Sequence, residues 1–355
     1  MPYLIVFLAA LAAAFILTPL MRRLSMRWGI VAEPGGRRKH VRAIPKLGGL
    51  AVFGAWAAGV FLVYWLLPPL EPDDALRLRG VILGSLLLTT GGLLDDWRDL
   101  KPWAQFLIQF MGAAIAISHL IFIEVFTNPL AASSFWHAPP FSWLLTIDGD
   151  LIWIWRPLAL LFTVFWVVGM INAINWLDGL DGLAAGVCTI AALLFAWHSY
   201  RLGQTTVALF PLALAGALLG FLPFNFAPAR IFLGTAGAYF LGYQVATLSI
   251  LSPAKLSTAL LVLAVPILDV AWQIINRLRR GQNPLQGDRG HLHFRLSDGG
   301  LPTRHIVVGY YIVAIAFGLV AILAPSGLFK LILWLALGTV VFALLIWLSR
   351  RPIKK

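Results

Sequence analysis

The sequence predicts an all-α polytopic membrane protein of about eleven transmembrane helices, with its N-terminus outside and its C-terminus in the cytoplasm. Hydrophobic residues make up 60% of the 355 residues and charged residues only 12%, which excludes an ordinary soluble domain. Because a backbone in lipid must satisfy its own hydrogen bonds, long apolar segments cross as helices. The expected spans lie near residues 3–21, 47–67, 79–94, 103–123, 157–174, 183–199, 205–223, 236–252, 256–276, 305–324 and 328–348.

The first apolar segment, residues 3–21, has no basic residues before it and no small-residue cleavage signal ahead of Arg22 and Arg23. A secretory signal peptide carries both features. We therefore expect this segment to be retained as a helix.

The chain contains one cysteine, Cys188, inside an apolar segment. A single cysteine excludes a disulfide framework and a cysteine-based metal site. We expect Cys188 to be a small core residue.

The distribution of the basic residues predicts the orientation. The chain has 27 Lys and Arg against 15 Asp and Glu, a formal net charge of +12. With the spans above, most of the basic residues fall on one side, which the positive-inside rule makes cytoplasmic. This clustering in loops explains the charge without nucleic acid, so we expect no nucleic-acid partner. For the basic tail, residues 350–355, topology and anionic lipid headgroups are sufficient reasons.

A short acidic stretch follows span 157–174. It reads NAINWLDGLDGL over residues 172–183 and carries Asp178 and Asp181. If it is helical, the two acids lie three residues apart on one face with Asn175 a further turn back, and one cation could touch all three. The alternative is a solvated loop in which the two Asp-Gly pairs only make turns. This stretch alone does not decide between the two.

A second acidic stretch, LDDWRDLK at residues 94–101, places Asp95, Asp96 and Asp99 just after span 79–94. Ionised carboxylates beside lipid are costly unless a cation or hydrogen bonds compensate them. Both stretches also fall on the predicted cytoplasmic side, among the basic loops. Oxygen ligands favour a hard cation, so we expect Mg²⁺, with Mn²⁺ as the alternative, bridging to a polyphosphate.

The first predicted cytoplasmic loop, residues 22–47, ends in GGRRKHVRAIPKLGG. Its glycines and proline indicate an irregular turn that presents basic groups. Arg38, Lys39, His40 and Lys46 could hold phosphate, although each of them could equally serve topology alone.

The segment FNFAPARIFLGTAGAYFLGY, residues 224–243, contains Asn225, Arg230, Gly234 and Gly237. This composition indicates a turn in which backbone N–H groups approach an anion. A Gly-x-x-Gly pattern alone is only a weak signal.

The last large cytoplasmic loop, residues 276–305, contains His291 and His293, flanked by Arg289 and Arg295. His-x-His could bind a transition metal, but no cysteine or third histidine lies beside it, so we expect phosphate recognition. A surface loop with two unremarkable histidines is the alternative.

Two further features lie outside these loops. The predicted outer segment, residues 124–156, is rich in proline and tryptophan, which indicates an interfacial hairpin or loop to which we assign no chemistry. Asp269 lies in span 256–276, about two turns from its cytoplasmic end. We expect it either to face the bundle interior or a cavity, or to pair with a nearby Arg.

Five strings together resemble the polyprenyl-phosphate N-acetylhexosamine-1-phosphate transferase family: IPKLGG, LDDWRDLKPW, NAINWLDGLDGLAAG, FNFAPARIFLG and GDRGHLHFRL, in that order along nearly the whole chain. The resemblance implies one integral membrane transferase domain over residues 1–355, with active-site loops near 22–47, 95–102, 175–183, 224–237 and 277–304.

The resemblance also implies an activity. Members of the family move a sugar-1-phosphate, here expected to be N-acetylglucosamine-1-phosphate, from a UDP-sugar to a polyprenyl phosphate such as undecaprenyl phosphate, and release UMP. The site would face the cytoplasm at the plasma (inner) membrane. The His-Leu-His loop is similar to the branch that uses UDP-N-acetylglucosamine or related sugars, rather than the branch that loads the muramoyl-pentapeptide precursor.

The site residues follow from the matching motifs. The aspartate pair of the family is implicated in positioning or deprotonating the lipid phosphate, the second acidic motif in binding Mg²⁺ and nucleotide, and the histidine motif in phosphate recognition. The catalytic residues implied are Asp95, Asp96, Asp178 and His291, and the metal ligands are Asp95, Asp178 and, as a weak candidate, Thr235. From the loop residues and the resemblance together, the expected substrate-binding residues are Lys46, Asn172, Asn175, Asp181, Asn225, Arg230, Arg289, His293 and Arg295.

Two positions depart from the family pattern. The family usually has Gly-Asp-x-Gly where this chain has Gly-Thr-Ala-Gly at residues 234–237, and the resemblance makes that aspartate a metal ligand. The hydroxyl of Thr235 is a weaker ligand than a carboxylate, so Mg²⁺ binding should weaken. Phe294 stands where the sugar-transferase branch often has a further histidine.

Four alternatives therefore stay open beside a divergent transferase: an inactive variant, a homologue that binds without turnover, an enzyme of the muramoyl-pentapeptide branch, and a lipid-binding or transport protein. Transporters often show repeated halves, and we find no such repeat. A homodimer is compatible with the sequence.

Overall fold

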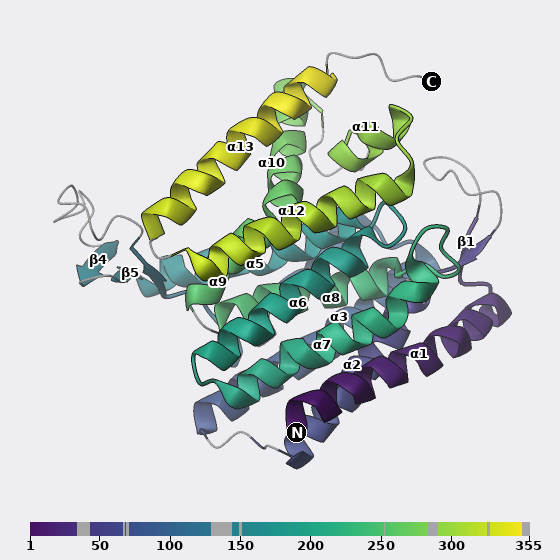
Figure 1. The fold of residues 1–355 in the computed structure, drawn as a ribbon, viewed down its shortest axis with the longest axis horizontal. Helices are drawn as coiled ribbons and strands as arrows, with labels where there is room; N and C mark the ends of the chain where they lie inside the picture. Colours follow the sequence, from purple (N-terminus) through teal and green to yellow (C-terminus); the bar gives the residue numbers. More distant parts are fainter. Residues whose placement is uncertain are drawn as a thin grey trace.

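The computed structural model describes residues 1–33, 43–66, 68, 71–128, 144–148, 151–251, 253–282, 290–324 and 327–349. Within them, the long helices run side by side and α10 crosses their direction (Figure 1). The helices are α1 Pro2–Trp28, α2 Gly48–Leu66, α3 Pro72–Arg98, α4 Pro102–Ser118, α5 Arg156–Leu177, α6 Leu183–Arg201, α7 Thr205–Asn225, α8 Gly234–Ile250, α9 Pro253–Val262, α10 Ala264–Arg279, α11 Leu292–Asp298, α12 Thr303–Leu323 and α13 Gly327–Ser349.

The helical membrane architecture is confirmed, but the count of eleven spans is not. In the described part of the chain, eight helices are long and apolar enough to cross a membrane, or nine if one bent pair counts as a single span. Each of the eleven predicted segments does contain a helix. However, α4 and α8 have only 17 residues each, fewer than the roughly 20 that a bilayer requires.

The bent pair is α9 and α10, which replace the straight span predicted at residues 256–276. The two helices meet at an angle of 73°, and Leu263 between them is not helical. Pro266 explains the break, because proline has no N–H to donate to the carbonyl of Val262 four residues earlier and its ring clashes there. The two halves are both apolar, so composition alone did not reveal the bend.

Helix α8 is surrounded by protein rather than by lipid. Every residue from Ala236 to Ser249 is buried, and α8 packs against α2, α3 and α5. Small residues let these helices approach closely, since a Cβ added at Gly84 would collide with Tyr243 and one added at Gly242 would collide with Ile171.

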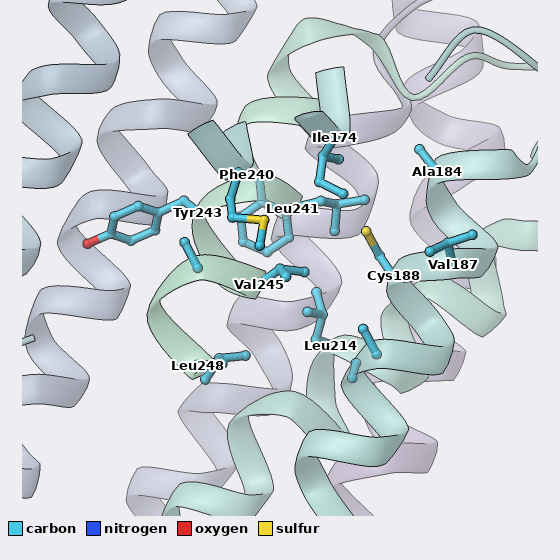
Figure 2. Packing of buried hydrophobic residues seen from close by; sticks show 14 of the residues in the cluster. Ile174, Ala184, Val187, Cys188, Leu214, Phe240, Leu241, Tyr243, Val245 and Leu248 are labelled. Carbon is cyan, nitrogen blue, oxygen red and sulfur yellow. The ribbon is translucent and has the colours of Figure 1, made fainter. Parts of the chain in front are cut away.

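Cys188 lies in the core, as expected, and is a free thiol. Figure 2 shows its side chain among apolar residues from several helices, with Ile174 of α5 and Leu214 of α7 nearby. It is fully buried, so its role is packing.

Two small sheets join the helices. At one end of the bundle, β1 (Val31–Ala32) pairs antiparallel with β2 (Ile44–Pro45). At the other, β3 (Val125–Thr127), β5 (Leu151–Ile154) and β4 (Leu145–Asp148) form an antiparallel sheet in that order. This confirms a hairpin in segment 124–156, whose proline-rich centre lies outside the described residues.

Candidate functional site

The predicted active-site loops meet at one end of the bundle. At this end α3, α5 and α7 finish and α2, α6 and α8 begin. Backbone hydrogen bonds join segments that are far apart in sequence: the N–H of Phe232 donates to the carbonyl of Pro45 at 2.8 Å, and the N–H of Gly49 donates to the carbonyl of Leu233 at 2.7 Å. The end of the first loop therefore lies beside the segment that leads into the Gly-Thr-Ala-Gly turn.

Asp96, at the end of α3, faces the N-terminus of α8. Its Oδ2 accepts a hydrogen bond from the N–H of Ala236 at 3.0 Å, and the backbone N–H of Thr235 also contacts this carboxylate. The ammonium group of Lys46 lies 3.5 Å from the backbone carbonyl oxygen of Asp96. Since the N-terminus of a helix favours an anion, this buried carboxylate is held by the Gly-Thr-Ala-Gly turn.

Gly234 begins this turn with φ at 74°, a left-handed conformation that glycine adopts without strain. A Cβ at this position would lie 2.6 Å from Oδ2 of Asp96. Both the backbone conformation and the close approach of the carboxylate therefore require glycine.

Asp95 points to a different neighbour. Its Oδ1 accepts hydrogen bonds from Nε2 of Gln105 at 2.7 Å and from the N–H of Leu100 at 3.1 Å. These contacts tie the end of α3 to the start of α4. The two adjacent aspartates are thus buried and fixed by separate partners, one in α4 and one in α8.

Asp178 and Asp181 lie in a turn, so the helical interpretation of this stretch was wrong. Helix α5 ends at Leu177, and α6 begins after Gly182, whose φ is 83°. Oδ2 of Asp181 accepts a hydrogen bond from the N–H of Ala229 at 2.8 Å, on the loop that follows α7. The Asp-Gly pairs do make turns, as the alternative supposed, and these turns aim the acids at the other loops.

The carboxylates of the two acidic stretches interact electrostatically. Burial raises the pKa of Asp178 well above that of an ordinary carboxyl, and the negative charges of Asp96 and Asp181 raise it further. The residue as a whole keeps some solvent exposure, whereas its carboxyl group lies in dense surroundings. Since these like charges act on one another, the two acidic stretches lie close together; that they share one site stays a prediction.

The histidine loop packs on the turn after α5. His291 and His293 are both buried, with their rings stacked at 5.7 Å between centroids. The ring of Trp176 lies 5.9 Å from that of His291, and a Cβ at Gly179 would collide with Nε2 of His293. The alternative of an unremarkable surface loop is therefore wrong for both histidines.

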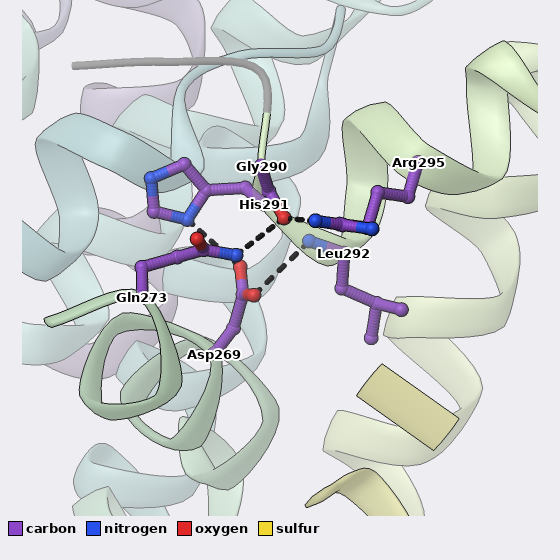
Figure 3. Close-up of polar contacts among 6 residues, drawn as sticks. All are labelled: Asp269, Gln273, Gly290, His291, Leu292 and Arg295. Carbon is purple, nitrogen blue, oxygen red and sulfur yellow. Dashed lines mark hydrogen bonds and ion pairs between the residues drawn. The ribbon is translucent and has the colours of Figure 1, made fainter. Parts of the chain in front are cut away.

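Among the described residues, Asp269 pairs with a histidine, whereas the sequence suggested an arginine as one of two possibilities. Its Oδ2 lies 3.0 Å from Nδ1 of His291, and its Oδ1 accepts the N–H of Leu292 at 3.0 Å (Figure 3). Sequence reasoning placed Asp269 near the cytoplasmic end of its span but gave it no partner in the histidine loop. The signal available in the sequence was the spacing of Asp269 and Gln273, which places two polar side chains on one face of an apolar helix.

Two of the asparagines predicted to bind substrate have their amides engaged within the protein. Nδ2 of Asn172 donates to Oε1 of Gln109 at 2.6 Å, which joins α5 to α4. Nδ2 of Asn225 donates to the carbonyl of Ile231 at 3.0 Å, which shapes the loop before α8. Both side chains thus hold neighbouring elements of the candidate site in place, and their contact with substrate stays a prediction.

Two other residues predicted to bind substrate, Asn175 and Arg230, are at least partly exposed to solvent. Asn175 is partly buried in the last turn of α5, and Arg230 is exposed on the loop before α8. Arg295 donates from Nε to the carbonyl of Gly290 at 2.7 Å. Of the other basic residues predicted here, Arg38, Lys39, His40 and Arg289 lie outside the described residues.

The acids fit a magnesium ion shared with a substrate. Within the described ranges, no three His, Cys, Asp or Glu side chains form a metal-binding group. Mg²⁺ does not need one, because it usually keeps several waters and binds one or two carboxylates together with substrate phosphates. Asp178, with the charges of Asp96 and Asp181 close by, would supply oxygen donors for such an ion. Asp95 has one oxygen, Oδ1, already engaged by two donors.

The packing of Gly179 gives a first prediction. A Cβ there would also lie 2.6 Å from Cζ of Phe294, so Gly179→Ala should displace the histidine loop from the turn and lower turnover by about 10- to 100-fold. Gly169→Ala in α5 is the matched control, because nothing lies within 4 Å of its added Cβ. Equal turnover of the two variants would contradict this contact.

Comparisons with known proteins identify the family. The family described as Glycosyl transferase family 4 matches residues 78–253. The chain is 32% identical to a probable undecaprenyl-phosphate N-acetylglucosaminyl 1-phosphate transferase of Bacillus subtilis (strain 168), over 97% of this chain and 90% of that protein. It is 32% identical to a decaprenyl-phosphate N-acetylglucosaminephosphotransferase of Mycolicibacterium smegmatis, over 97% and 88%. It is 26% identical to an undecaprenyl-phosphate alpha-N-acetylglucosaminyl 1-phosphate transferase of Escherichia coli (strain K12), over 85% and 78%.

The similarity to the first two relatives covers nearly the whole chain. The resemblance based on five motifs is thereby confirmed, and the class of enzyme with it. The chain belongs to the family of polyprenyl-phosphate N-acetylglucosamine-1-phosphate transferases and is a membrane-embedded glycosyl-1-phosphate transferase.

Proposed function

We propose that the protein transfers N-acetylglucosamine-1-phosphate from UDP-N-acetylglucosamine to a polyprenyl phosphate and releases UMP, at the cytoplasmic face of the plasma membrane. The observation that carries the proposal is the convergence of Asp96, Asp178 and Asp181 beside the histidine loop at one end of an apolar bundle. A lipid phosphate at the boundary of the bilayer and a water-soluble nucleotide can meet at such a place. The positive-inside rule supports the cytoplasmic orientation.

The reaction joins two anions, so charge compensation is the main task of the site. An oxygen of the lipid phosphate attacks the β-phosphorus of the nucleotide sugar, and the bond from that phosphorus to the oxygen of UMP breaks. When bound, Mg²⁺ supplies neutralising charge to the phosphate oxygens. Lys46 contributes a fixed positive charge beside Asp96, and Asp95 and Asp96 position or deprotonate the lipid phosphate. His291 and His293 contact the diphosphate, and Asn175 and Asp181 line the nucleotide side.

Turnover by the purified protein tests this proposal. We expect release of UMP from UDP-N-acetylglucosamine that requires both Mg²⁺ and polyprenyl phosphate. A preference for the UDP-muramoyl-pentapeptide precursor would instead favour the other branch of transferases. Nucleotide binding without UMP release, in the wild type and also in Thr235→Asp, would overturn the proposal in favour of a non-catalytic homologue.

The Thr235→Asp variant gives a second prediction. Because the backbone of Thr235 contacts the carboxylate of Asp96, an acid here would add a negative charge beside the proposed Mg²⁺. Since affinity for such ions follows the number of charged ligands, the Mg²⁺ concentration for half-maximal turnover should fall by roughly tenfold. Thr235→Asn, with a similar shape and no charge, is the control and should not lower it. An unchanged Mg²⁺ requirement in Thr235→Asp would place residue 235 away from the ion.

A further inference from the structure

We propose that Asp269 of α10 is a positioning residue, which fixes the ring orientation and the tautomer of His291 for its contact with a phosphate. The inference rests on the proposed function in that it assigns His291 to phosphate recognition. It adds a second layer to the site, supplied by a helix that carries none of the proposed catalytic residues.

Each oxygen of the Asp269 carboxylate contacts one of two consecutive residues. Oδ2 meets Nδ1 of His291 and Oδ1 meets the N–H of Leu292, each at 3.0 Å. The side chains of Asp269 and His291 are both only 5% exposed, so water does not compete for these contacts. The carboxylate therefore specifies both the direction of the ring and the backbone that carries it.

Gln273 adds a hydrogen bond to the residue before His291. It lies one helical turn after Asp269, on the same face of α10, and its Nε2 donates to the carbonyl of Gly290. Nε of Arg295 donates to the same carbonyl at 2.7 Å, as Figure 3 shows. Each of residues 290–292 thus has a hydrogen bond to α10. These contacts hold the start of α11, a helix of only 7 residues.

The contact decides which nitrogen of His291 faces the site. A carboxylate only accepts, so in the neutral ring it holds the proton on Nδ1 and leaves Nε2 as the free nitrogen. Figure 3 shows Nδ1 turned toward Asp269 and the other nitrogen turned away from it. When the ring is protonated, the same carboxylate stabilises the cation while Nε2–H can donate to a phosphate oxygen. Trp176 and His293 pack near the ring and limit its rotation.

Asp269→Asn separates positioning from simple packing. The amide has nearly the same shape, and its Oδ1 can still accept the N–H of Leu292. Its Nδ2 must then donate to Nδ1 of His291, which moves the proton of the neutral ring to Nε2. Beside an amide that donates to Nδ1, the ring can no longer carry both protons and present a positive charge to the reacting phosphate. We therefore expect kcat to fall by about 100-fold and KM for the UDP-sugar to change by less than about threefold.

A double-variant cycle shows whether Asp269 acts through His291. If it does, Asp269→Asn combined with His291→Asn should be no slower than His291→Asn alone, because the two losses are not additive. Additive losses would overturn the proposal and leave Asp269 as a structural anchor. Gln273→Ala is the comparison variant, since it removes a backbone contact but leaves the ring partner, and it should lower kcat by only a few fold.

A readout without turnover keeps the proposal testable if the proposed function fails. Nitrogen-15 NMR of histidine-labelled protein, with His291→Asn to assign the signal, reports which ring nitrogen carries the proton. The wild type should show the proton of the neutral ring on Nδ1, and Asp269→Asn should show it on Nε2. The same tautomer in both proteins would overturn the proposal. The expected change of tautomer in a protein that releases no UMP would instead refute only the proposed function.

Discussion

Asp178→Asn should lower turnover by about 1,000-fold while the protein stays folded. Asp178 is the acid on which the charges of Asp96 and Asp181 act together with burial. We propose it as a ligand of Mg²⁺, and an amide oxygen without negative charge binds Mg²⁺ much more weakly than a carboxylate. The measurement is UMP release at saturating substrates over a range of Mg²⁺ concentrations.

The same substitution should stabilise the metal-free protein. The pKa of Asp178 is raised in the folded state, so the folded protein binds more protons than the unfolded one between the ordinary and the raised value. Its stability therefore falls as pH rises through that window, and the full penalty applies above the raised pKa. Asparagine has no charge to bury, so the midpoint of thermal unfolding should be higher than in the wild type at neutral pH. This difference should shrink toward pH 4 and on addition of Mg²⁺.

Asp73→Asn provides the control for Asp178. Asp73 lies in the first turn of α3, at the opposite end of the bundle, and is exposed. Its loss removes the same charge from the chain without touching the site, so turnover and its Mg²⁺ dependence should stay as in the wild type. If Asp178→Asn kept near-normal turnover, Asp178 would not belong to the site.

Asp95→Asn should also lower turnover by about 1,000-fold, without unfolding the start of α4. The Oδ1 of asparagine can accept the same hydrogen bonds, from Nε2 of Gln105 and the N–H of Leu100, that the aspartate accepts. Only the charge is lost, and with it the proposed contact with the lipid phosphate. The expected result is a lower kcat with an unchanged midpoint of thermal unfolding.

Asp99→Asn is the matched control on the same turn. Asp99 is exposed, and its φ is 45°, a left-handed conformation that asparagine tolerates well. The substitution removes one negative charge four residues from Asp95 and disturbs no buried contact, so we expect turnover within about twofold of the wild type. Comparable losses in the two variants would show that the total charge of this turn matters, and not a specific contact of Asp95.

The sequence predicted the gathering of the loops because the spans alternate in direction. Once helices are assigned, the ends of α3, α5 and α7 must lie on the same side as the starts of α2, α6 and α8, and the two acidic stretches fall there together. Composition also predicted the helical fold, since few other structures satisfy a backbone in lipid. Neither inference depends on where a particular helix ends or on the route of a particular loop.

The features that could not be predicted depend on those local details. Asp178 lies in a turn because α5 ends at Leu177, and periodicity cannot show the last residue of a helix. The partner of Asp269 is a histidine 22 residues later, brought back by a loop whose route the sequence does not encode locally. The bend of α9 and α10 did have a signal in Pro266, which an average over apolar residues hides.

That bend divides the site between two separately supported parts. The carboxylates lie at the end of α3 and in the turn after α5, and both of these helices pack against α8. Residues 290–292 are instead hydrogen-bonded to α10, which follows the bend at Leu263. The histidine loop meets the turn after α5 at Gly179, so α10 and α5 together fix the position of His291 relative to Asp178. The angle at Leu263 therefore sets where α10 places residues 290–292 relative to the carboxylates, and with it the geometry in which a diphosphate would be held between them.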